Sequence, residues 1–532
     1  MNTIELGEAV DKYFPHETFN PGQREAILKV SAALLAGKKH VVLEAPTGIG
    51  KSAIATTVHR VVKAAKPSFR TTIITATKGL QDQYEQEDRE IYSLKGKKNY
   101  ECPLGVGPYN SAGCRKMVHS GGCRKAVICP YFKTRVKWCN ESALRITNTS
   151  FQIEACPSIV MLPENKADMI IIDECHTIDE HLVSHSSLKL SLSEMTHTVD
   201  DIIKGKIATF INEFVEVKDG DAFHATDDQR EIANSLSSYL EGHISVLEGK
   251  MKAGGKMHDS ITGTLEELQQ ITDKLAGFAK LGGEWILMKF GFATELELKP
   301  VYASQVAEYG MFRKATQFIH MSATICGYDS YIKTLGIAQN DSIYIEVANP
   351  IPLENRKVYA MGSIKVSGNF DRDRLAMLVD KIIGRHVGQN GIIHSVSFAL
   401  AEEIKALSKN KKRMLISRDR KEILDFLKKP NGNIVVSPSI EQGYDFKGDM
   451  SRFQIIPKVP FHYIGDKWVS LNMNRHPEWY ARKAILRTVQ AAGRSVRGVD
   501  DYASTYIIDE NFTRLHQRNR DIFPKWFLES IV

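Results

Sequence analysis

The amino-acid sequence predicts an α/β protein built from two doubly wound domains with parallel sheets. Three observations favour this class: short apolar strands alternate with helical patterns in two regions, a glycine-rich segment follows the first strand, and an acidic pair follows another. The expected strands of the first region are 40–43, 71–75, 169–172 and 318–321. Those of the second region are 391–394, 433–436, 453–456 and 506–508. Ligands of such domains are expected at the carboxyl ends of the strands.

Length and composition allow three or four domains. The 532 residues can bury several separate cores, and 43% of them are apolar and 25% charged. No run of 18 or more apolar residues occurs, so no membrane span is expected. The first residues, MNTIELGEAVDKYF, lack the basic and apolar regions of a signal peptide. We therefore expect a cytoplasmic protein without a membrane partner, from a bacterium or a virus-infected cell.

Positive charge is concentrated between Ser93 and Arg145. This stretch holds eleven Lys and Arg residues against two acids, whereas the whole chain has a net charge of +7. Such a block is typical of a surface that contacts a phosphate backbone. The alternative is a solvated surface loop, which the interleaved aromatic residues and cysteines disfavour.

A long insertion is expected within the first α/β region. Almost 150 residues separate Asp173 from Ser322, far more than one crossover between strands needs. Residues 180–298 are rich in Leu, Ile, Lys and Glu at helical spacing. The sequence therefore predicts a largely helical insertion.

The segment Ala45–Ser52 (APTGIGKS) has the features of a phosphate-binding loop. Such a loop needs glycines so that backbone N–H groups can approach a phosphate, a lysine for charge and a hydroxyl for Mg²⁺. A strand precedes the segment, a helix-compatible stretch follows it, and only the usual first glycine is replaced, by Ala45. The nucleotide-binding residues predicted here are Thr47, Gly48, Gly50, Lys51 and Ser52.

Two carboxylates, Asp173 and Glu174, follow the apolar run Met169–Ile172 and are expected at a strand tip that faces the phosphates. A carboxylate there can hold Mg²⁺ while its neighbour orients the attacking water. We assign the first role to Asp173, together with the hydroxyl of Ser52, and the second role to Glu174. An ordinary acidic pair at a helix N-terminus is the alternative, and the presence of the phosphate-binding loop argues against it.

A pair of arginines in the second α/β region completes the expected nucleotide site. Phosphoryl transfer needs cations near the developing charge. Arg494 and Arg497 are three residues apart on an expected helix and would share one face. We predict that both reach the γ-phosphate across the cleft between the two regions, which would link cleft closure to nucleotide state. Two surface arginines are the alternative.

With these motifs in order, the chain resembles the superfamily 2 DNA helicases of the XPD/DinG type over nearly its whole length. The stretches that carry the resemblance are Asn20–Gln23 (NPGQ), Thr75–Gln83 (TATKGLQDQ), Asp173–His176 (DECH), Met321–Thr324 (MSAT), Ser437–Phe446 (SPSIEQGYDF) and Gln490–Arg497 (QAAGRSVR). Ile440 and Gln442 depart from the family's motif V. Asn511 stands where many relatives carry an arginine, so no role of that arginine is carried over.

The resemblance implies two RecA-like motor domains with two insertions in the first. The implied boundaries are 1–94, 146–185 and 299–335 for the first motor domain, 95–145 for an iron–sulfur insert, 186–298 for a helical arch and 336–532 for the second motor domain. It also implies that Gln23 contacts adenine and that Gly443 and Asp445 help to bind the nucleotide. Gln490 is implied to act in catalysis with Lys51, the two carboxylates and the two arginines.

Five of the eight cysteines lie between Cys102 and Cys139. Their spacing contains no CxxC pair, so zinc-finger patterns do not fit, and from spacing alone zinc and an iron–sulfur cluster are both open. The resemblance implies a [4Fe–4S] cluster on Cys102, Cys114, Cys123 and Cys129. Cys139 in place of Cys114 gives the alternative set of ligands.

The resemblance implies an ATP-dependent helicase that moves 5′ to 3′ on single-stranded DNA and opens forked or tailed duplexes as a monomer. Its cofactors would be ATP, Mg²⁺ and the cluster. The alternative is a nucleic-acid-stimulated ATPase that clamps or remodels DNA without processive unwinding. A nuclease is not expected, because only a short segment follows Arg497. The pathway (repair or replication), the preference for DNA or RNA and the protein partners stay open.

Overall fold

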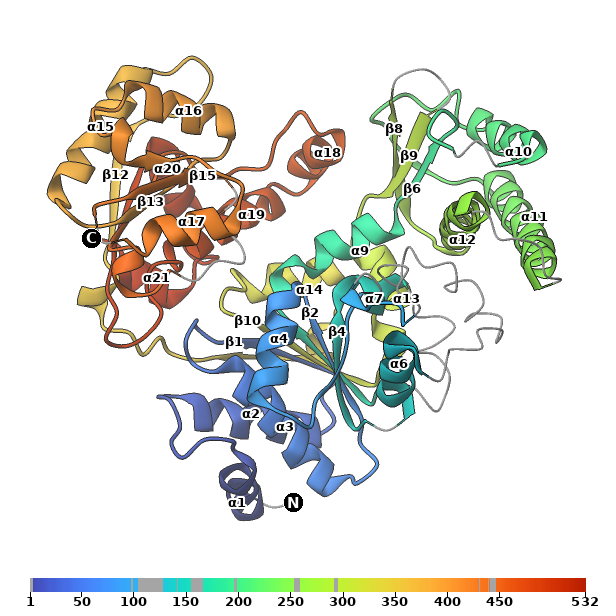
Figure 1. Cartoon of the computed structure of the whole chain (residues 1–532), viewed down its shortest axis with the longest axis horizontal. Helices are drawn as coiled ribbons and strands as arrows, with labels where there is room; N and C mark the ends of the chain where they lie inside the picture. Colours follow the sequence, from blue (N-terminus) through green and yellow to red (C-terminus); the bar gives the residue numbers. More distant parts are fainter. Residues whose placement is uncertain are drawn as a thin grey trace.

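The computed structural model describes residues 3–96, 99–103, 128–140, 142–154, 166–195, 199–252, 259–290, 295–429, 431–438, 440 and 446–532. It contains two parallel sheets, each with helices packed around it, and a third unit with a small antiparallel sheet (Figure 1). The fold class that the sequence predicts, α/β with two doubly wound domains, is confirmed.

The first motor domain is built on a seven-stranded sheet with the order β11-β1-β10-β5-β2-β4-β3, whose neighbouring strands are parallel. Its strands are β1 (His40–Glu44), β2 (Thr71–Thr75), β3 (Tyr92–Leu94), β4 (Leu144–Asn148), β5 (Met169–Asp173), β10 (Gln317–Ser322) and β11 (Ser342–Glu346). Its helices are α1 (Thr3–Tyr13), α2 (Gln23–Leu35), α3 (Lys51–Ala65), α4 (Lys78–Glu87), α6 (Pro130–Asn140), α7 (Thr149–Glu154), α9 (Ile178–Ser186), α13 (Ser304–Gly310) and α14 (Tyr328–Leu335). Every residue of β1, β2 and β5 is buried, as expected for parallel strands that are covered on both faces.

The register of three neighbouring strands determines where the site lies. Glu44 of β1 pairs with Ser322 of β10, and Met321 of β10 pairs with Asp173 of β5. The carboxyl ends of these three strands therefore lie side by side. The phosphate-binding loop, the MSAT motif and the DECH motif lie at these ends, so parallel pairing brings together three motifs that are far apart in the sequence.

The second motor domain has a six-stranded parallel sheet with the order β12-β17-β16-β13-β15-β14. Its strands are β12 (Val358–Ile364), β13 (Gly391–His394), β14 (Met414–Leu415), β15 (Ile434–Ser437), β16 (Phe453–Ile456) and β17 (Ser504–Asp509). Its helices are α15 (Arg372–Arg385), α16 (Phe398–Leu407), α17 (Arg420–Leu427), α18 (Lys467–Arg475), α19 (Pro477–Ala492), α20 (Glu510–Arg518) and α21 (Lys525–Ser530). One boundary differs from the sequence prediction: β11 lies beyond residue 335 yet pairs with β1, so the first motor domain extends further than expected.

The insertion between β5 and β10 forms a unit of its own, here called the arch. Its four-stranded antiparallel sheet has the order β6-β9-β8-β7. The strands are β6 (Leu188–Ser191), β7 (Ala222–His224), β8 (Glu284–Lys289) and β9 (Glu295–Pro300), and the helices are α10 (Asp201–Asn212), α11 (Asp227–Lys252) and α12 (Asp259–Lys280). The helices agree with the sequence prediction, whereas the sheet is not predicted, because its strands are short and lie among longer helical patterns.

Short 3₁₀ segments connect several elements: η4 (Cys175–Thr177), η5 (Phe312–Lys314), η6 (Gln339–Asp341), η7 (Leu353–Asn355), η8 (Lys411–Arg413) and η9 (Gly448–Met450). Among the helices that the structure describes, none combines the length and the apolar character that a membrane crossing needs.

One apolar core extends across all three units. It includes Ile172 of β5, Leu182 of α9, Leu298 of β9 and two tryptophans, Trp468 of α18 and Trp479 of α19. Helices α18 and α19, here called the arm, extend from the second motor domain toward the first motor domain and the arch (Figure 1). The arm therefore packs against β9 of the arch and connects it with the two motor domains.

Candidate nucleotide site between the motor domains

The phosphate-binding loop connects β1 to α3 and depends on two glycines. Gly48 and Gly50 have φ angles of 86° and 80°, in the left-handed region that favours glycine. A Cβ at Gly48 would lie 2.6 Å from the backbone oxygen of Arg497, and one at Gly50 would lie 2.6 Å from Nε2 of Gln23. Gly48 is therefore required by conformation and by space, and Gly50 by conformation. The loop leads into the N-terminus of α3, where unpaired backbone N–H groups favour a phosphate.

Lys51 and Ser52 occupy the first two positions of α3, as the motif predicts. The Lys51 ammonium donates a hydrogen bond to the carbonyl of Ala45, over 3.4 Å. Ala45, which replaces the usual glycine, is fully buried, and its N–H continues the β1–β10 ladder by donating to the carbonyl of Ser322. The substitution at Ala45 is thus compatible with the loop, because that residue belongs to the end of the strand.

Asp173 lies at the tip of β5 with its carboxylate buried. Its oxygens accept hydrogen bonds from the Tyr84 hydroxyl, at 3.1 Å, and from the Glu174 N–H, at 3.0 Å. Burial raises the pKa of Asp173 to about 7, and the charge of Glu174 adds to this, while Lys51 acts in the opposite direction. Tyr84, on α4, is a site residue that sequence reasoning missed, and its position directly after the TATKGLQDQ stretch is the signal that could have found it.

Glu174 is one of the two non-glycine residues with positive φ in the described chain, at 54°. Such a backbone is strained and persists only where its surroundings hold it. The carboxylate accepts a hydrogen bond from Nδ1 of His176, at 3.2 Å. Burial acts to raise the pKa of Glu174, but the His176 hydrogen bond and the charges of Lys51 and Arg494 hold it below its ordinary value. Glu174 is therefore an ionised hydrogen-bond acceptor, the form needed to orient a water molecule.

His176 connects the DECH motif to the MSAT motif and to the second motor domain. Its Nδ1 lies 2.9 Å from the hydroxyl of Ser322, and its Nε2 lies 2.6 Å from Nε2 of Gln490 on α19. The Gln490 amide also donates to the hydroxyl of Thr324, over 3.4 Å. Because an amide nitrogen can only donate, Nε2 of His176 must be the acceptor and Nδ1 must carry the proton. This tautomer also satisfies the contact with Glu174.

The two predicted arginines come close to the first motor domain, but neither lies on a helix. Helix α19 ends at Ala492, with Gly493 as its C-cap, so the expectation that Arg494 and Arg497 share a helical face is wrong. The charge of Arg494 nevertheless acts on Glu174 across the cleft. Arg497 lies with its backbone oxygen against Gly48, while its N–H donates to Asp501. Contact of either guanidinium with a γ-phosphate stays a prediction.

Gln23, the predicted adenine contact, is buried against the phosphate-binding loop. Its amide donates to the carbonyl of Gly50, at 3.1 Å, and its oxygen accepts from the N–H of Asn20. The Asn20 amide donates to the carbonyl of Ile49, at 3.2 Å. The NPGQ stretch therefore supports the loop directly, and the adenine contact stays a prediction.

Four predicted site residues lie outside the described residues: Cys114, Cys123, Gly443 and Asp445. Cys102 and Cys129 are described and are 5% and 3% exposed. Cys129 packs in an apolar cluster with Tyr131, Trp138 and Cys139. Within the described ranges, no group of three or more metal-ligating side chains comes together.

Two family models match separate parts of the chain. The model of the helicase C-terminal domain matches residues 387–530. The model of the type III restriction enzyme res subunit matches residues 16–204. No curated protein matched the sequence.

Several solved structures have the same fold over nearly the full chain. One XPD helicase ("XPD_Helicase") aligns with a TM-score of 0.62 and 16% identity, covering 97% of this chain and 100% of that one. Another ("XPD_APO") aligns with a TM-score of 0.56 and 16% identity, covering 93% and 98%. The structure of S. tokodaii Xpd4 aligns with a TM-score of 0.57 and 13% identity, covering 96% and 98%.

Fold, domain models and site geometry agree with one another. Two RecA-like domains share a site assembled from a phosphate-binding loop, a DECH box and a QxxGRxxR segment. The chain has the XPD/DinG-like fold, with the arch inserted between β5 and β10. Its second motor domain matches the model of the helicase C-terminal domain.

Proposed function

We propose that this chain is an ATP-dependent DNA helicase that acts as a monomer, translocates 5′ to 3′ on single-stranded DNA and opens forked or tailed duplexes. The hydrogen bond between Gln490 and His176 supports this most strongly, because it joins the second motor domain to the catalytic motif of the first. A triphosphate in this cleft would contact both domains. Its hydrolysis would therefore change how far apart they lie.

ATP would bind at the N-terminus of α3, where the N–H groups of the loop are available to the β-phosphate. Lys51 would exchange the carbonyl of Ala45 for the phosphates, a stronger partner for an ammonium group. Ser52 and Asp173 would hold Mg²⁺, which supplies positive charge beside the β- and γ-phosphates.

Glu174 would orient the attacking water through its ionised carboxylate. The hydrogen bond from His176 helps to lower the pKa of this carboxylate. Arg494 would bring a positive charge from the second motor domain to the γ-phosphate as negative charge develops there. Gln490 of α19 is bound to both His176 and Thr324. A change in this site would therefore move α19.

We further propose that Cys102, Cys114, Cys123 and Cys129 hold a [4Fe–4S] cluster, whose four thiolate bonds would cross-link the insert. The burial of Cys102 and Cys129 supports this, because cluster ligands are shielded from water. Anaerobically purified protein should contain about four irons per chain and absorb broadly near 400 nm. A colourless protein that contains zinc would contradict it.

An unwinding assay on 5′-tailed and 3′-tailed duplexes tests the function. ATP-dependent opening of the 5′-tailed substrate is expected, and Lys51→Ala should abolish it while leaving DNA binding intact. Opening of only the 3′-tailed duplex would contradict the polarity. Stimulated ATP hydrolysis without strand opening on either substrate would favour the clamping ATPase instead.

The insert can be tested separately. Cys102→Ser should reduce strand separation more than ATP hydrolysis, because the cysteine lies outside the nucleotide site. Equal loss of both activities would show that the insert does not act as a separable element.

A further inference from the structure

Two buried cations on α19 make contacts with the first motor domain. The guanidinium of Arg482 donates to the carbonyls of Ile325 and Cys326, each at 2.9 Å, directly after the MSAT motif. The ammonium of Lys483 lies 2.8 Å from Oδ1 of Asp179 and 2.8 Å from Oε1 of Glu180 on α9. Both cationic side chains are almost fully buried, with Lys483 only 1% exposed.

The surroundings of Lys483 make this contact an interdomain one. Asp179 and Glu180 follow the DECH motif by a few residues, on the first full helical turn after it. Their side chains are 7% and 39% exposed. Although burial acts to raise the pKa of Glu180, the charge and the hydrogen bond of Lys483 hold it below its ordinary value. Lys483 and the two carboxylates thus form an ion pair that joins the two motor domains.

A buried ion pair is a poor way to gain stability, because removing both charges from water costs about as much as their attraction returns. It is, however, highly sensitive to separation. Once water enters between the charges, the attraction falls several-fold, since the effective dielectric constant rises from that of a protein toward that of water. Between two domains that open and close, such a pair holds only the closed arrangement.

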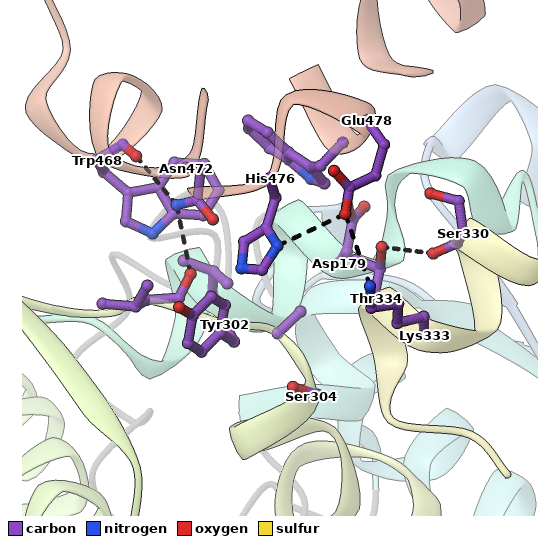
Figure 2. Close-up of a pocket in the computed structure, with 14 residues that line it drawn as sticks. Asp179, Tyr302, Ser304, Ser330, Lys333, Thr334, Trp468, Asn472, His476 and Glu478 are labelled. Atoms are coloured by element: carbon purple, nitrogen blue, oxygen red, sulfur yellow. Dashed lines mark hydrogen bonds and ion pairs between the residues drawn. The ribbon is translucent and has the colours of Figure 1, made fainter. Parts of the chain in front are cut away.

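A pocket lies next to the ion pair, at the contact between the two motor domains. A cavity of about 390 Å³ lies beside Asp179, between α9, α14 and the arm (Figure 2). Polar contacts at its edges join the two sides, such as Asn472 to the carbonyl of Val301 and Lys333 to Glu478. Because this pocket is partly open to the surface, water can reach the edge of the ion pair.

Lys483 and the nucleotide site are connected by one rigid helix. Gln490 follows Lys483 by seven residues, two helical turns, so both side chains lie on the same face of α19 about 10 Å apart along its axis. Lys483 contacts α9 just after the DECH motif, and Gln490 contacts His176 within it. Holding one contact therefore favours the other.

We propose that Lys483 is a positioning residue: with Asp179 and Glu180 it forms a latch that holds the QxxGRxxR segment against the DECH box in the closed arrangement. The latch rests on the proposed function in one respect: closure of the two motor domains must serve ATP turnover. Lys483 touches no reacting atom, and its effect passes through the placement of Gln490 and Arg494.

Lys333 provides a matched control. Its ammonium also pairs across the two domains, with Glu478 at 3.6 Å, but the two side chains are 74% and 46% exposed. An exposed pair contributes little. Lys333→Met therefore removes the same charge from the same interface without breaking a buried pair.

The experiment compares full-length Lys483→Met, Lys483→Arg, Asp179→Asn and Lys333→Met without nucleic acid. Binding of a fluorescent non-hydrolysable ATP analogue and the radius of gyration from solution scattering are measured. Lys483→Met is expected to weaken binding about tenfold and to enlarge the radius. Lys483→Arg should recover most of the loss, Lys333→Met should stay within about twofold of wild type, and adding Asp179→Asn to Lys483→Met should cost nothing more.

Wild-type binding and an unchanged radius in Lys483→Met would overturn the latch. If that variant does not fold, Asp179→Asn carries the test, because it keeps the shape of the aspartate and should weaken binding alone. A wild-type chain that closes on the analogue but opens no duplex would contradict the proposed function and leave the latch standing.

Discussion

At the scale of single residues, two separate demands require a glycine at position 48. Its φ of 86° strains any residue with a side chain, and a Cβ there would lie 2.6 Å from the backbone oxygen of Arg497. The first demand comes from the phosphate-binding loop, and the second comes from the other motor domain. Gly48 therefore allows the two domains to approach each other at the nucleotide site.

Gly48→Ala is expected to weaken ATP binding by more than about tenfold, because the added methyl group both strains the loop and pushes Arg497 away. Gly37→Ala is the matched control, since Gly37 has a φ of 88° but no atom near its added Cβ. The control should lose only about 1 kcal/mol of stability and keep its ATP affinity. Equal ATP affinities in the two variants, measured by calorimetry, would contradict this view of Gly48.

Glu44 is a buried carboxyl at the end of β1. It accepts hydrogen bonds from the Tyr344 hydroxyl and the Ile325 N–H. Burial raises its pKa from 4.5 to about 7. The folded chain therefore binds this proton more tightly than the unfolded chain, and its stability falls as the pH rises from about 4.5 to 7.

Glu44→Gln is expected to remove this part of the pH dependence, because the amide keeps the shape of the side chain and does not ionise. Between pH 5 and pH 8, the wild type should lose up to about 3 kcal/mol of unfolding free energy that the variant keeps. Urea unfolding at the two pH values measures the difference. Parallel losses in both proteins would show that Glu44 does not retain its proton on folding.

At the scale of elements, the arm holds the base of the arch. The indole N–H of Trp468 donates to the carbonyl of Pro300, at 2.9 Å, and the Lys299 ammonium lies 4.5 Å from the centre of a Trp468 ring. Arg475 donates to the Tyr302 hydroxyl, at 3.2 Å. The arch is thus held by the second motor domain as well as by its covalent connections to the first.

Trp468→Ala should leave a cavity at this contact and cost about 3–5 kcal/mol locally. Faster amide hydrogen exchange is expected in β8 and β9, while β1 and β5 keep their protection. Tyr463→Ala is the control, because Tyr463 lies in the connection before α18 and is 79% exposed. Unchanged exchange in β9 of the Trp468 variant would mean that the arm does not support the arch.

At the scale of the whole molecule, local composition predicts the motor sheets but not the arch sheet. A run such as Met169–Ile172 is apolar at every position, as a strand buried on both faces must be. The strand Ala222–His224 has three residues and no such pattern. It forms because the neighbouring β8 supplies its hydrogen bonds, which is a long-range condition that the sequence does not display.

The nucleotide site likewise has parts that the local sequence predicts and parts that it does not. Lys51, Asp173 and Glu174 belong to local motifs, and the sequence predicts them directly. The contacts of Tyr84 with Asp173 and of Gln490 with His176 depend on strand order and on how the two domains pack, so they need the structure. The sequence also does not predict that α19 ends at Ala492. A single glycine, Gly493, within a helix-compatible run does not decide whether the helix ends there.

The whole molecule acts as a motor only if a nucleotide bound mainly by the first domain needs a charge from the second. ATP turnover by Arg494→Ala in the presence of single-stranded DNA measures this, with circular dichroism to verify folding. We expect turnover to fall about a thousandfold, while the ATP analogue still binds through Lys51. Turnover within about twofold of wild type would contradict a catalytic site shared between the two domains.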